Sequence, residues 1–440
     1  MAYKAYVVRV KELRPHSNAD RLQIATFFGN DTCVSLDTKI GDLGVYFPSD
    51  GQVSVEFAEA NNLVRKKDAE GNNIGGYMDP NKRNITAIKL RGERSDGIYL
   101  PISCLESFGD ITTLKEGDII DVFNGHEICK KYIPRRQHSN RDYSTSGHKT
   151  HKNKKNLEET PYFAEHVDTP QLRFCMETFK PGDVICLTEK VHGTSSRNAN
   201  TLVISHKQTW LDKLLHREGK EIQTYKYVVG TRRTTVRDNV GGYYGSNDFR
   251  IRWGEKFKGK LNPGEEVFGE LAGYTDDGKT IMAIANNEKT KDKEFIKRFG
   301  PTSTFTYGCE PNTSRYFVYR MTYTSPDGYV IEYPWDLVKL RAEQMGFEVV
   351  PELDRFIYTT EEDFLARIKK WLDVPSTIDA SHIIEGVVVR ALNAPNLRIA
   401  KEKSWNFKVI EGIAKAEAEA PDMEEAEELL TEIEEEIIEI

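Results

Sequence analysis

Short runs of apolar and β-branched residues, separated by turn-forming residues, characterise the first 130 positions of the chain. The clearest runs are 6–10, 22–28 and 119–123. Glycine, asparagine, aspartate or proline gathers between such runs, for example at 28–31 and 48–51. This pattern is typical of strands of about five residues joined by turns. Many short strands at even spacing predict a small β-barrel.

Beyond position 180 the pattern changes. Residues 184–187 and 202–205 are apolar runs that predict strands, and 316–323 alternates aromatic and other residues with the period of a strand. Near the end of the chain, apolar residues instead recur at 3-4-3-4-3 spacing, which predicts a helix with one apolar stripe. Its members are Met423, Ala426, Leu430, Ile433, Ile437 and Ile440.

The composition describes a chain of more than one domain. Its 440 residues are too many for one ordinary core, and 38% are hydrophobic against 30% charged. The longest apolar runs are far shorter than a membrane span, and the N-terminus lacks the apolar core of a signal peptide. The six cysteines are scattered, with no Cys-x-x-Cys pair. We therefore expect free thiols in a reducing cytoplasm and no zinc cluster.

Charge is distributed unevenly along the chain. Residues 411–440 contain thirteen acidic residues and one lysine, a net charge of −12. Because the whole chain carries −8, the other 410 residues carry +4. Residues 130–156 contain nine Lys or Arg and one Asp. A basic segment of this kind attracts a phosphate backbone, although many such runs are only solvated linkers. The acidic tail predicts either a helix packed on the protein or a competitor for the basic segment.

One lysine stands where a predicted strand ends. Lys190 follows the run 184–187, and Gly193 then turns the chain into the hydroxyl residues Thr194 and Ser195. A lysine at the mouth of a strand, close to a glycine, can present its amine to a phosphate, which makes Lys190 a candidate nucleophile. Taken alone, the pattern fits a solvated lysine beside a turn better.

Charged residues recur in later strand-like runs. Glu270 interrupts the apolar run 267–274, where an unpaired buried carboxylate would be costly. Glu385 lies in a β-branched run and precedes a glycine that permits close backbone approach, which suits a divalent metal site. Lys401 and Lys403 are two positions apart, so both ammonium groups point to one strand face and can meet one phosphate. A structural salt bridge is the alternative for Glu270.

The segment Lys190-Val191-His192-Gly193 resembles the lysine-x-histidine-glycine form of motif I in covalent nucleotidyltransferases, specifically RNA ligases of the RNA ligase 2 type. Glu189 and Thr194 match that type too. Residues resembling the later motifs follow in order: Arg232 for motif Ia with Arg233 as its rival, Glu270 for III, Phe317 or Tyr319 for IIIa, Glu385 for IV, and Lys401 with Lys403 for V. The chain departs from the family at Ser195, commonly asparagine, and at Arg320, usually aspartate, which puts particular sugar and base contacts in doubt.

The resemblance implies ATP as cofactor, with AMP carried covalently on Lys190, and Mg²⁺ or Mn²⁺. It implies that Lys190, Arg232, Lys401 and Lys403 are catalytic, and that Glu385 and Glu270 hold the metal. Glu189 would read the adenine, Glu270 the ribose, and Phe317 or Tyr319 would stack on the base. The expected nucleotide site comprises Leu187, Glu189, Lys190, Gly193, Thr194, Ser195, Arg232, Glu270, Phe317, Tyr319, Glu385, Lys401 and Lys403.

A second resemblance lies near the N-terminus. Residues 16–22 are similar to the His-x-Asn-Ala-Asp-Arg-Leu signature of the tRNA-binding OB-fold, although Asn18 and Asp20 could simply cap a turn. An OB domain ahead of a ligase domain resembles the Deinococcus- and Naegleria-type nick-sealing RNA ligases. The implied fold class is α+β. Its expected parts are an OB-like β-barrel at 1–129, a basic linker at 130–156, a nucleotidyltransferase domain of ATP-grasp-like antiparallel sheets with helices at 157–410, and an acidic helical tail at 411–440.

The implied activity is ATP-dependent joining of RNA 3′-hydroxyl and 5′-phosphate ends in RNA repair. We expect RNA ends, or a nick in duplex RNA or an RNA/DNA hybrid, as the partner, together with no membrane contact and a monomeric state. Three alternatives remain open: a DNA ligase, a GTP-dependent capping-type enzyme, and a non-catalytic OB-fold RNA-binding protein. His192 and the N-terminal position of the OB domain argue against the first two. The complete set of Lys190, Glu385, Lys401 and Lys403 argues against the third.

Overall fold

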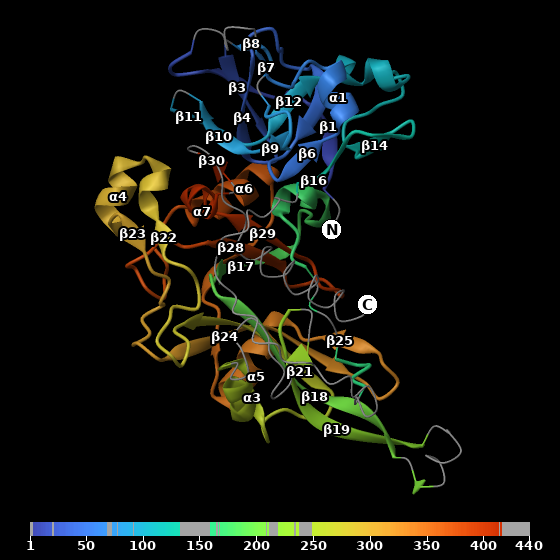
Figure 1. Cartoon of the computed structure of the whole chain (residues 1–440), viewed down its shortest axis with the longest axis vertical. Coiled ribbons are helices and arrows are strands. Elements are labelled where there is room, and N and C mark those ends of the chain that lie inside the picture. The colour runs from blue at the N-terminus through green and yellow to red at the C-terminus, as the bar shows by residue number, and fades with distance from the viewer. Residues whose placement is uncertain are drawn as a thin grey trace.

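The computed structural model describes residues 3–19, 22–67, 73–76, 78–90, 92–132, 159–163, 166, 168–207, 209–210, 219–232, 235–236, 249–412 and 414–415. We call 3–132 the N-terminal region and 159–412 the C-terminal region. Figure 1 shows an elongated molecule with the N-terminal region at one end and a long sheet at the other. A smaller sheet with helices α6 and α7 lies between them. No helix in the described ranges is long and apolar enough to cross a membrane.

The N-terminal region is built from short strands around its own core. Its largest sheet has the order β12-β5-β1-β13, with strands Ile98–Pro101, Leu43–Phe47, Ala5–Arg9 and Ile119–Ile120. Smaller sheets are β2-β3-β4 (Leu13–Pro15, Leu22–Phe27, Asn30–Ser35), β16-β6-β9 (Cys129–Lys131, Gly51–Val53, Asn84–Ile85) and β11-β10-β30 (Glu93–Ser95, Ala87–Leu90, Ala414–Lys415). Short pairs are β7 (Lys66–Lys67) with β8 (Asn73–Gly75) and β14 (Val122–Phe123) with β15 (His126–Glu127). Helix α1 (Val55–Ala60) packs here as well.

Strand β1 shows why its sequence is apolar at consecutive positions. Tyr6 and Val8 point into a cluster that includes Tyr46, whereas Val7 points into a second cluster on the opposite face. Successive side chains of a strand face opposite sides, so a strand covered on both faces needs apolar residues throughout. The sheet therefore separates two small cores, each filled by alternate residues of the same strands.

The long sheet of the C-terminal region has the order β20-β19-β18-β21-β24-β25, with β26 attached to β24. These strands are Thr235–Val236, Lys220–Gly230, Thr194–Lys207, Glu265–Gly273, Ser314–Thr324, Val330–Glu332 and Glu348–Val349. All of its pairings are antiparallel except that between β24 and β26. Helices α3 (Phe249–Phe257) and α5 (Trp335–Met345) pack on this sheet through the largest hydrophobic core.

The second sheet of the C-terminal region is antiparallel, in the order β27-β17-β28-β29. Its strands are Glu352–Ile357, Val184–Lys190, Gly386–Ala391 and Ile399–Lys403. Helix α6 (Glu361–Lys370) packs against it through Phe364 and Ile368. Helix α7 (Trp405–Glu411) follows β29 directly. Helix α4 (Lys293–Phe299) and the pair β22 (Ala285–Asn286) and β23 (Thr302–Ser303) lie at the side of the molecule (Figure 1).

Helix α6 illustrates local signals that fix an element. Thr360 caps its N-terminus by accepting a hydrogen bond from the Asp363 backbone N–H. Acidic residues occupy the first turn and basic residues the last. Each end of the helix dipole therefore lies beside charges of the opposite sign, which stabilises the helix. The apolar residues fall on the side that faces the four-stranded sheet, so both the ends and the orientation of α6 follow from its sequence.

The α+β class with antiparallel sheets and a β-rich N-terminal region is confirmed. The predicted domain limits stay predictions. Most of the basic linker, and residues 416–440 with the acidic tail, lie outside the described residues. The limit at 410 falls inside α7, and 414–415 form strand β30, which pairs in parallel with β10. The start of the predicted acidic tail is therefore a folded segment attached to the N-terminal region.

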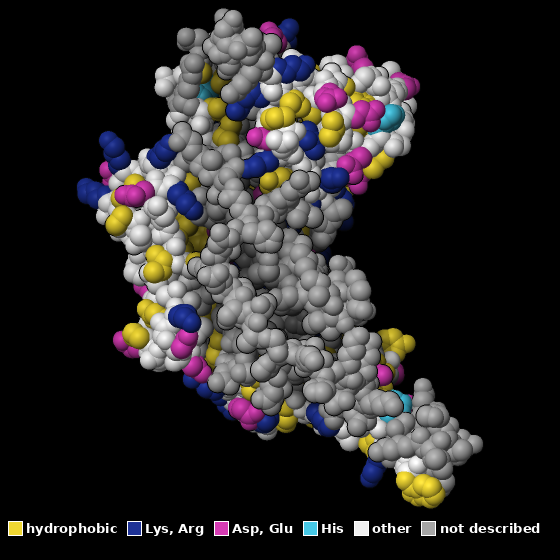
Figure 2. Space-filling model, in the orientation of Figure 1, with side chains coloured by type: hydrophobic (Ala, Val, Ile, Leu, Met, Phe, Trp, Pro, Cys, Tyr) yellow, Lys and Arg dark blue, Asp and Glu magenta, His cyan; other side chains and the backbone are white. Residues whose placement is uncertain are grey.

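The OB-like signature occupies a turn beside β10. The His16 ring nitrogen Nε2 lies 3.0 Å from the Leu90 carbonyl oxygen, and the Asn18 N–H donates to His16 Nδ1. Asp20 and Arg21 lie outside the described residues. On the face shown in Figure 2, Lys and Arg side chains of the N-terminal region are mixed with Asp and Glu. The described part of that face is therefore of mixed charge.

Candidate functional site

The two sheets of the C-terminal region face each other across a pocket. The four-stranded sheet lines it with Thr188, Glu189, Lys190, Val388, Arg390, Ile399 and Lys401. The long sheet lines it with Ser195, Glu270, Tyr319 and Arg320, and the connecting segments add His166, Thr169, Val191, Arg232 and Val350. Five of these residues are Lys or Arg. A pocket with so many cations on facing walls suits a ligand that carries several negative charges.

Lys190 ends β17 at the edge of this pocket. In the sheet register Lys190 pairs with Gly386, which in turn pairs with Lys403, so the three residues form a row across the strands. Lys190 Nζ lies 2.7 Å from Glu385 Oε1, and Lys403 Nζ lies 3.3 Å from the same oxygen. The Lys190 side chain is only 13% exposed. The pairing holds the amine in one place, at the point where the strand opens into the pocket.

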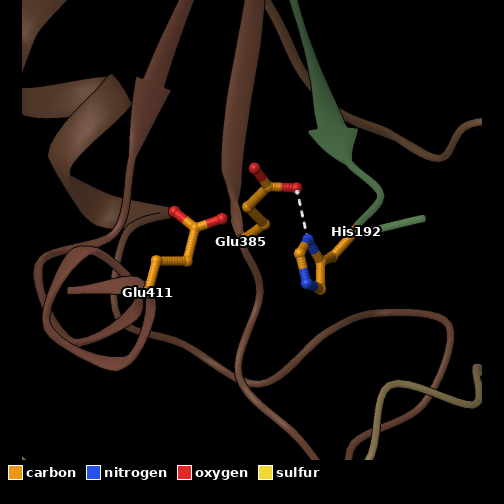
Figure 3. Close-up of side chains that lie close together, drawn as sticks. All are labelled: His192, Glu385 and Glu411. Carbon is orange, nitrogen blue, oxygen red and sulfur yellow. Dashed lines mark ion pairs between the residues drawn. The ribbon is translucent and has the colours of Figure 1, made fainter. Parts of the chain in front are cut away.

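Glu385 lies at the centre of a buried cluster with His192 and Glu411 (Figure 3). The sequence predicted Glu385 inside a strand, but the residue stands just before β28. His192 Nδ1 is 3.7 Å from Glu385 Oε2, and its ring packs edge-on against Phe305 and Phe407. The backbone N–H of His192 donates to the Tyr307 hydroxyl at 2.6 Å. This packing fixes the segment that follows Lys190.

The donor set of this cluster bears on the expected metal. One ligand atom each from His192, Glu385 and Glu411 lie within 4.8 Å of one another, close enough to share an ion. The ammonium groups of Lys190 and Lys403, however, already contact Glu385, so a directly bound cation would compete with them. The arrangement fits Mg²⁺ held through water, since this ion usually keeps several of its waters.

The turn after Lys190 needs the glycine in the middle of it. A Cβ atom at Gly193 would lie 2.3 Å from the Leu271 carbonyl oxygen and 2.9 Å from Glu270 Cγ. Gly193 therefore lets β18 begin directly against β21. Thr194 accepts a short hydrogen bond from the Arg250 guanidinium, and Arg250 Nε donates to the Ser195 carbonyl oxygen at 3.0 Å. Arg250 thus fixes the hydroxyl residues of the turn.

Glu270 and Arg232 reach the pocket from the long sheet. Glu270 pairs with Ser195 in the register, and the Ser195 hydroxyl donates to Glu270 Oε2 at 3.4 Å. Arg232 follows the end of β19, and its Nη2 donates to Asp168 Oδ1 at 2.6 Å. The rival for its role, Arg233, lies outside the described residues. Glu270 can accept hydrogen bonds from a ligand, and Arg232 can donate them.

A β-bulge separates the two candidate stacking rings. Phe268 on β21 pairs with Arg320 and the next residue pairs with Val318, so Tyr319 is the extra residue of β24. Bulges re-aim side chains, and here the consecutive residues Tyr319 and Arg320 both line the pocket. Phe317 is 1% exposed and belongs to the hydrophobic core. Tyr319, and not Phe317, is therefore placed to stack on a ligand.

Leu187 and Glu189, both expected at the nucleotide, make other side-chain contacts in this structure, although Glu189 itself lines the pocket. Leu187 is buried in the core between the four-stranded sheet and α6. Glu189 accepts hydrogen bonds from the Ser376 hydroxyl and from the Thr377 N–H and hydroxyl. Both side chains point to the face of β17 opposite to that of Thr188 and Lys190, because side chains alternate along a strand. The expected contact of Leu187 is therefore corrected to Thr188. The Glu189 carboxylate holds the 376–377 turn, and its expected role in reading adenine stays a prediction.

Lys401 and Lys403 share a strand face, as their spacing predicted. Lys401 lines the pocket, whereas Lys403 is 6% exposed and reaches Glu385 and Glu411. Lys403 Nζ lies 2.8 Å from Glu411 Oε2. Glu411 was counted with the acidic tail in the sequence, but it is the last residue of α7 and 7% exposed. It is a functional candidate that sequence reasoning missed.

Three further pocket residues were not found from the sequence. Burial and the nearby Arg232 and Arg320 lower the pKa of His166 to about 3, so its imidazole is neutral at pH 7. Burial lowers the pKa of Arg390 to about 10, with Arg320 adding repulsion. Arg320 donates to Glu332 through Nε at 3.0 Å. In the sequence, Arg320 stood out only as a departure from the family pattern, and Arg390 only as the last residue of the segment that resembles motif IV. Nothing in the sequence pointed to His166.

Comparisons with known proteins agree on one family. Residues 183–410 match the family model for RNA ligase. A mutant of the Naegleria gruberi RNA ligase with ATP and Mn superposes with a TM-score of 0.53 at 15% identity, covering 91% of this chain and 96% of that one. An apo mutant of the same ligase gives 0.53 at 17%, covering 93% and 98%. That ligase with PPi gives 0.51 at 16%, covering 92% and 97%. No curated protein matches this chain.

Proposed function

This chain belongs to the RNA ligase family, and we propose that it joins RNA 3′-hydroxyl and 5′-phosphate ends at the expense of ATP. The observation that carries the proposal is the position of Lys190. Its amine stands at the edge of a pocket whose walls carry four other cations, and a buried glutamate holds it in place. Naegleria gruberi RNA ligase structures with ATP and Mn, and with AMP and Mn, support the choice of nucleotide and metal.

The first chemical step forms a bond between Lys190 Nζ and the α-phosphorus of ATP. Pyrophosphate leaves, and AMP remains on the lysine as a phosphoramidate. The attacking amine must be neutral, so it has to give up a proton before it attacks. Glu385, 2.7 Å from the amine, is positioned to receive its proton.

The remaining cations act on the phosphates. Lys401 and Arg232 line the pocket on opposite walls, so each can neutralise charge that develops on the transferring group. Glu270 and Glu385 would hold a divalent ion through its waters, and when bound this ion adds charge stabilisation at the same phosphate. Tyr319 and Val388 both line the pocket, and we place the purine ring of ATP between them.

Two further steps complete the joining of strands. AMP passes from Lys190 to the RNA 5′-phosphate, and the 3′-hydroxyl then attacks that activated phosphate while AMP leaves. We propose a nick in duplex RNA or an RNA/DNA hybrid as the substrate, and RNA repair in a reducing cytoplasm as the setting. All six cysteines are free thiols, which is in keeping with that compartment.

Substitution of Tyr319 and of Phe317 should have different consequences. Tyr319→Ala removes a stacking platform, worth about 1–3 kcal/mol per base, so the apparent KM for ATP should rise about 5- to 150-fold. Phe317→Ala empties a core position and should lower the free energy of unfolding by about 3–5 kcal/mol. Initial rates of protein labelling over a range of ATP concentrations, and urea denaturation, measure the two effects.

Tyr329→Ala is the control for this pair, because Tyr329 is 72% exposed and lies in the turn between β24 and β25. It should change neither quantity. A larger KM effect from Phe317→Ala than from Tyr319→Ala, in a protein that remains folded, would contradict the assignment of Tyr319 as the stacking ring.

The substrate class is tested with nicked duplexes that differ only at the 3′-hydroxyl side. We expect a nick with ribonucleotides there to be sealed at least about 10-fold faster than a nick with deoxyribonucleotides, because the 2′-hydroxyl is the group that distinguishes RNA from DNA. Sealing of labelled strands at equal enzyme concentration gives the ratio. Equal rates on the two nicks would contradict the RNA preference, and labelling from GTP alone would favour a capping-type enzyme.

A further inference from the structure

Asp96 belongs to the N-terminal region and is held there by its backbone. It lies between β11 and β12, where its N–H donates to the Asp31 carbonyl oxygen at 2.8 Å. Its own carbonyl oxygen accepts hydrogen bonds from the Thr32 and Tyr46 hydroxyls at 2.9 and 2.8 Å. Strands on three sides therefore fix the position of this residue.

The Asp96 side chain points out of the N-terminal region to two cations of the C-terminal region. Asp96 Oδ1 lies 2.9 Å from Arg173 Nη1, and Oδ2 lies 3.3 Å from Lys408 Nζ on α7. All three side chains are at most 6% exposed. Despite its burial, the neighbouring Arg173 and Lys408 hold the pKa of the Asp96 carboxyl well below its usual range.

Both cations lead to the strand that carries the two motif V lysines. Lys408 Nζ lies 3.0 Å from Glu402 Oε1, and Glu402 stands between Lys401 and Lys403 on β29. On the other side, Arg173 belongs to the 3₁₀ helix Leu172–Phe174. The segment leading into that helix pairs with β29, because the Lys401 N–H donates to the Pro170 carbonyl oxygen at 2.8 Å. Asp96 thus reaches β29 by a side-chain route and by a backbone route.

We propose that Asp96 is a positioning residue for nucleotide transfer, and that the N-terminal region sets the place of Lys401 and Lys403 in the pocket. The proposal rests on the proposed function of the pocket. It gives the N-terminal region a part in the first chemical step, which takes place before any RNA is bound. A module that only holds RNA would have no effect on that step.

The chemistry of the network supports a positional role over simple adhesion. A buried set of charges is costly to desolvate, and a well-packed apolar contact would join two regions at least as firmly. What such a network adds is geometry, because each hydrogen bond fixes a direction. The contact of Arg94 with Asp373 at 3.0 Å also joins the two regions, but the Arg94 side chain is 43% exposed and Asp373 hydrogen-bonds to Ser404 and Asn406, which follow β29, rather than to the strand itself. It offers a natural control.

The test measures lysyl-AMP formation in the full chain, with labelled ATP and Mg²⁺ and without RNA. Asp96→Asn keeps the size of the side chain and removes its charge. We expect the maximal rate of labelling to fall about 10- to 100-fold, the range that a displacement of up to ~1 Å at a reacting centre produces. The ATP concentration at half-maximal rate should change less than threefold, and Arg94→Gln should leave both values unchanged.

A double-mutant cycle separates positioning from a general loss of structure. If Asp96 acts through β29, Asp96→Asn should have little further effect on the slow residual labelling of a Lys401→Ala variant. Additive losses would indicate general damage and would overturn the inference. Unchanged labelling by Asp96→Asn, with its fold verified by circular dichroism, would also overturn it.

Glu402→Gln covers the case in which Asp96→Asn does not fold. It breaks only the link between Lys408 and β29, at a side chain that is 12% exposed. A reduced labelling rate without loss of thermal stability supports the inference, and an unchanged rate contradicts it. Wild-type protein that takes no label would overturn the proposed function and this inference together. Labelled wild type with fully active Asp96→Asn and Glu402→Gln would overturn the inference alone.

Discussion

Lys190→Ala is expected to abolish transfer of AMP to the protein and, with it, ATP-dependent sealing of a nick. The amine that it removes is the atom proposed to bond to the α-phosphorus, and loss of a catalytic nucleophile costs up to about 10⁶-fold in rate. The fold should be retained, because Lys190 stands at the end of its strand and Lys403 still balances the charge of Glu385. Gel analysis of protein incubated with labelled ATP and Mg²⁺ measures the first effect, and sealing of a labelled nick measures the second.

A substrate that already carries AMP sharpens this prediction. An RNA nick with a preformed adenylylated 5′-end bypasses the bond to Lys190, so Lys190→Ala should still seal it at a measurable rate. Lys207→Ala, at the exposed end of β18, is the matched control and should behave as wild type in both assays. Undiminished ATP-dependent sealing by Lys190→Ala would contradict the assignment of the nucleophile.

Glu385→Gln should have the second-largest effect, because it alters both stability and rate. The fully buried Glu385 carboxylate contacts the ammonium groups of Lys190 and Lys403, and an amide cannot balance their charge. Removing one partner from a buried ionic cluster typically costs about 3–5 kcal/mol of unfolding free energy. The rate of lysyl-AMP formation should also fall by at least about 10²-fold, since the amine loses its fixed position and its proton acceptor.

Urea denaturation and single-turnover labelling measure these two effects separately. Glu361→Gln in the first turn of α6 is a control of the same chemistry at an exposed position, and it should change stability by less than about 0.5 kcal/mol. If Glu385→Gln were as stable as wild type and equally active, the buried cluster could not be what holds Lys190 in place.

How well the sequence predicts the position of a site residue differs from residue to residue, for physical reasons. The period of two along a strand placed Lys401 and Lys403 on one face, and the structure agrees. The same rule, applied to β17, puts Leu187 on the opposite face from Lys190, although the family resemblance had grouped the two. Local periodicity was therefore a better guide than the motif to the direction of a side chain.

Long-range pairing could not be predicted in this way. The bulge that selects Tyr319 over Phe317 exists only in the register between β21 and β24. Asp96 and Lys408 are 312 positions apart, and nothing near either residue signals their contact. Glu411 looked like one acid of a solvated tail until α7 placed it beside Lys403. Each of these features depends on how distant segments pack.

The most direct test of the central claim is to locate the nucleotide on the protein. Wild-type protein incubated with ATP and Mg²⁺ is digested and the peptides are analysed by mass spectrometry. The account predicts AMP on the peptide that contains Lys190, and its release as free AMP when nicked RNA is added before digestion. AMP on a peptide that contains Lys401 or Lys403 instead, or no modified peptide at all, would contradict it.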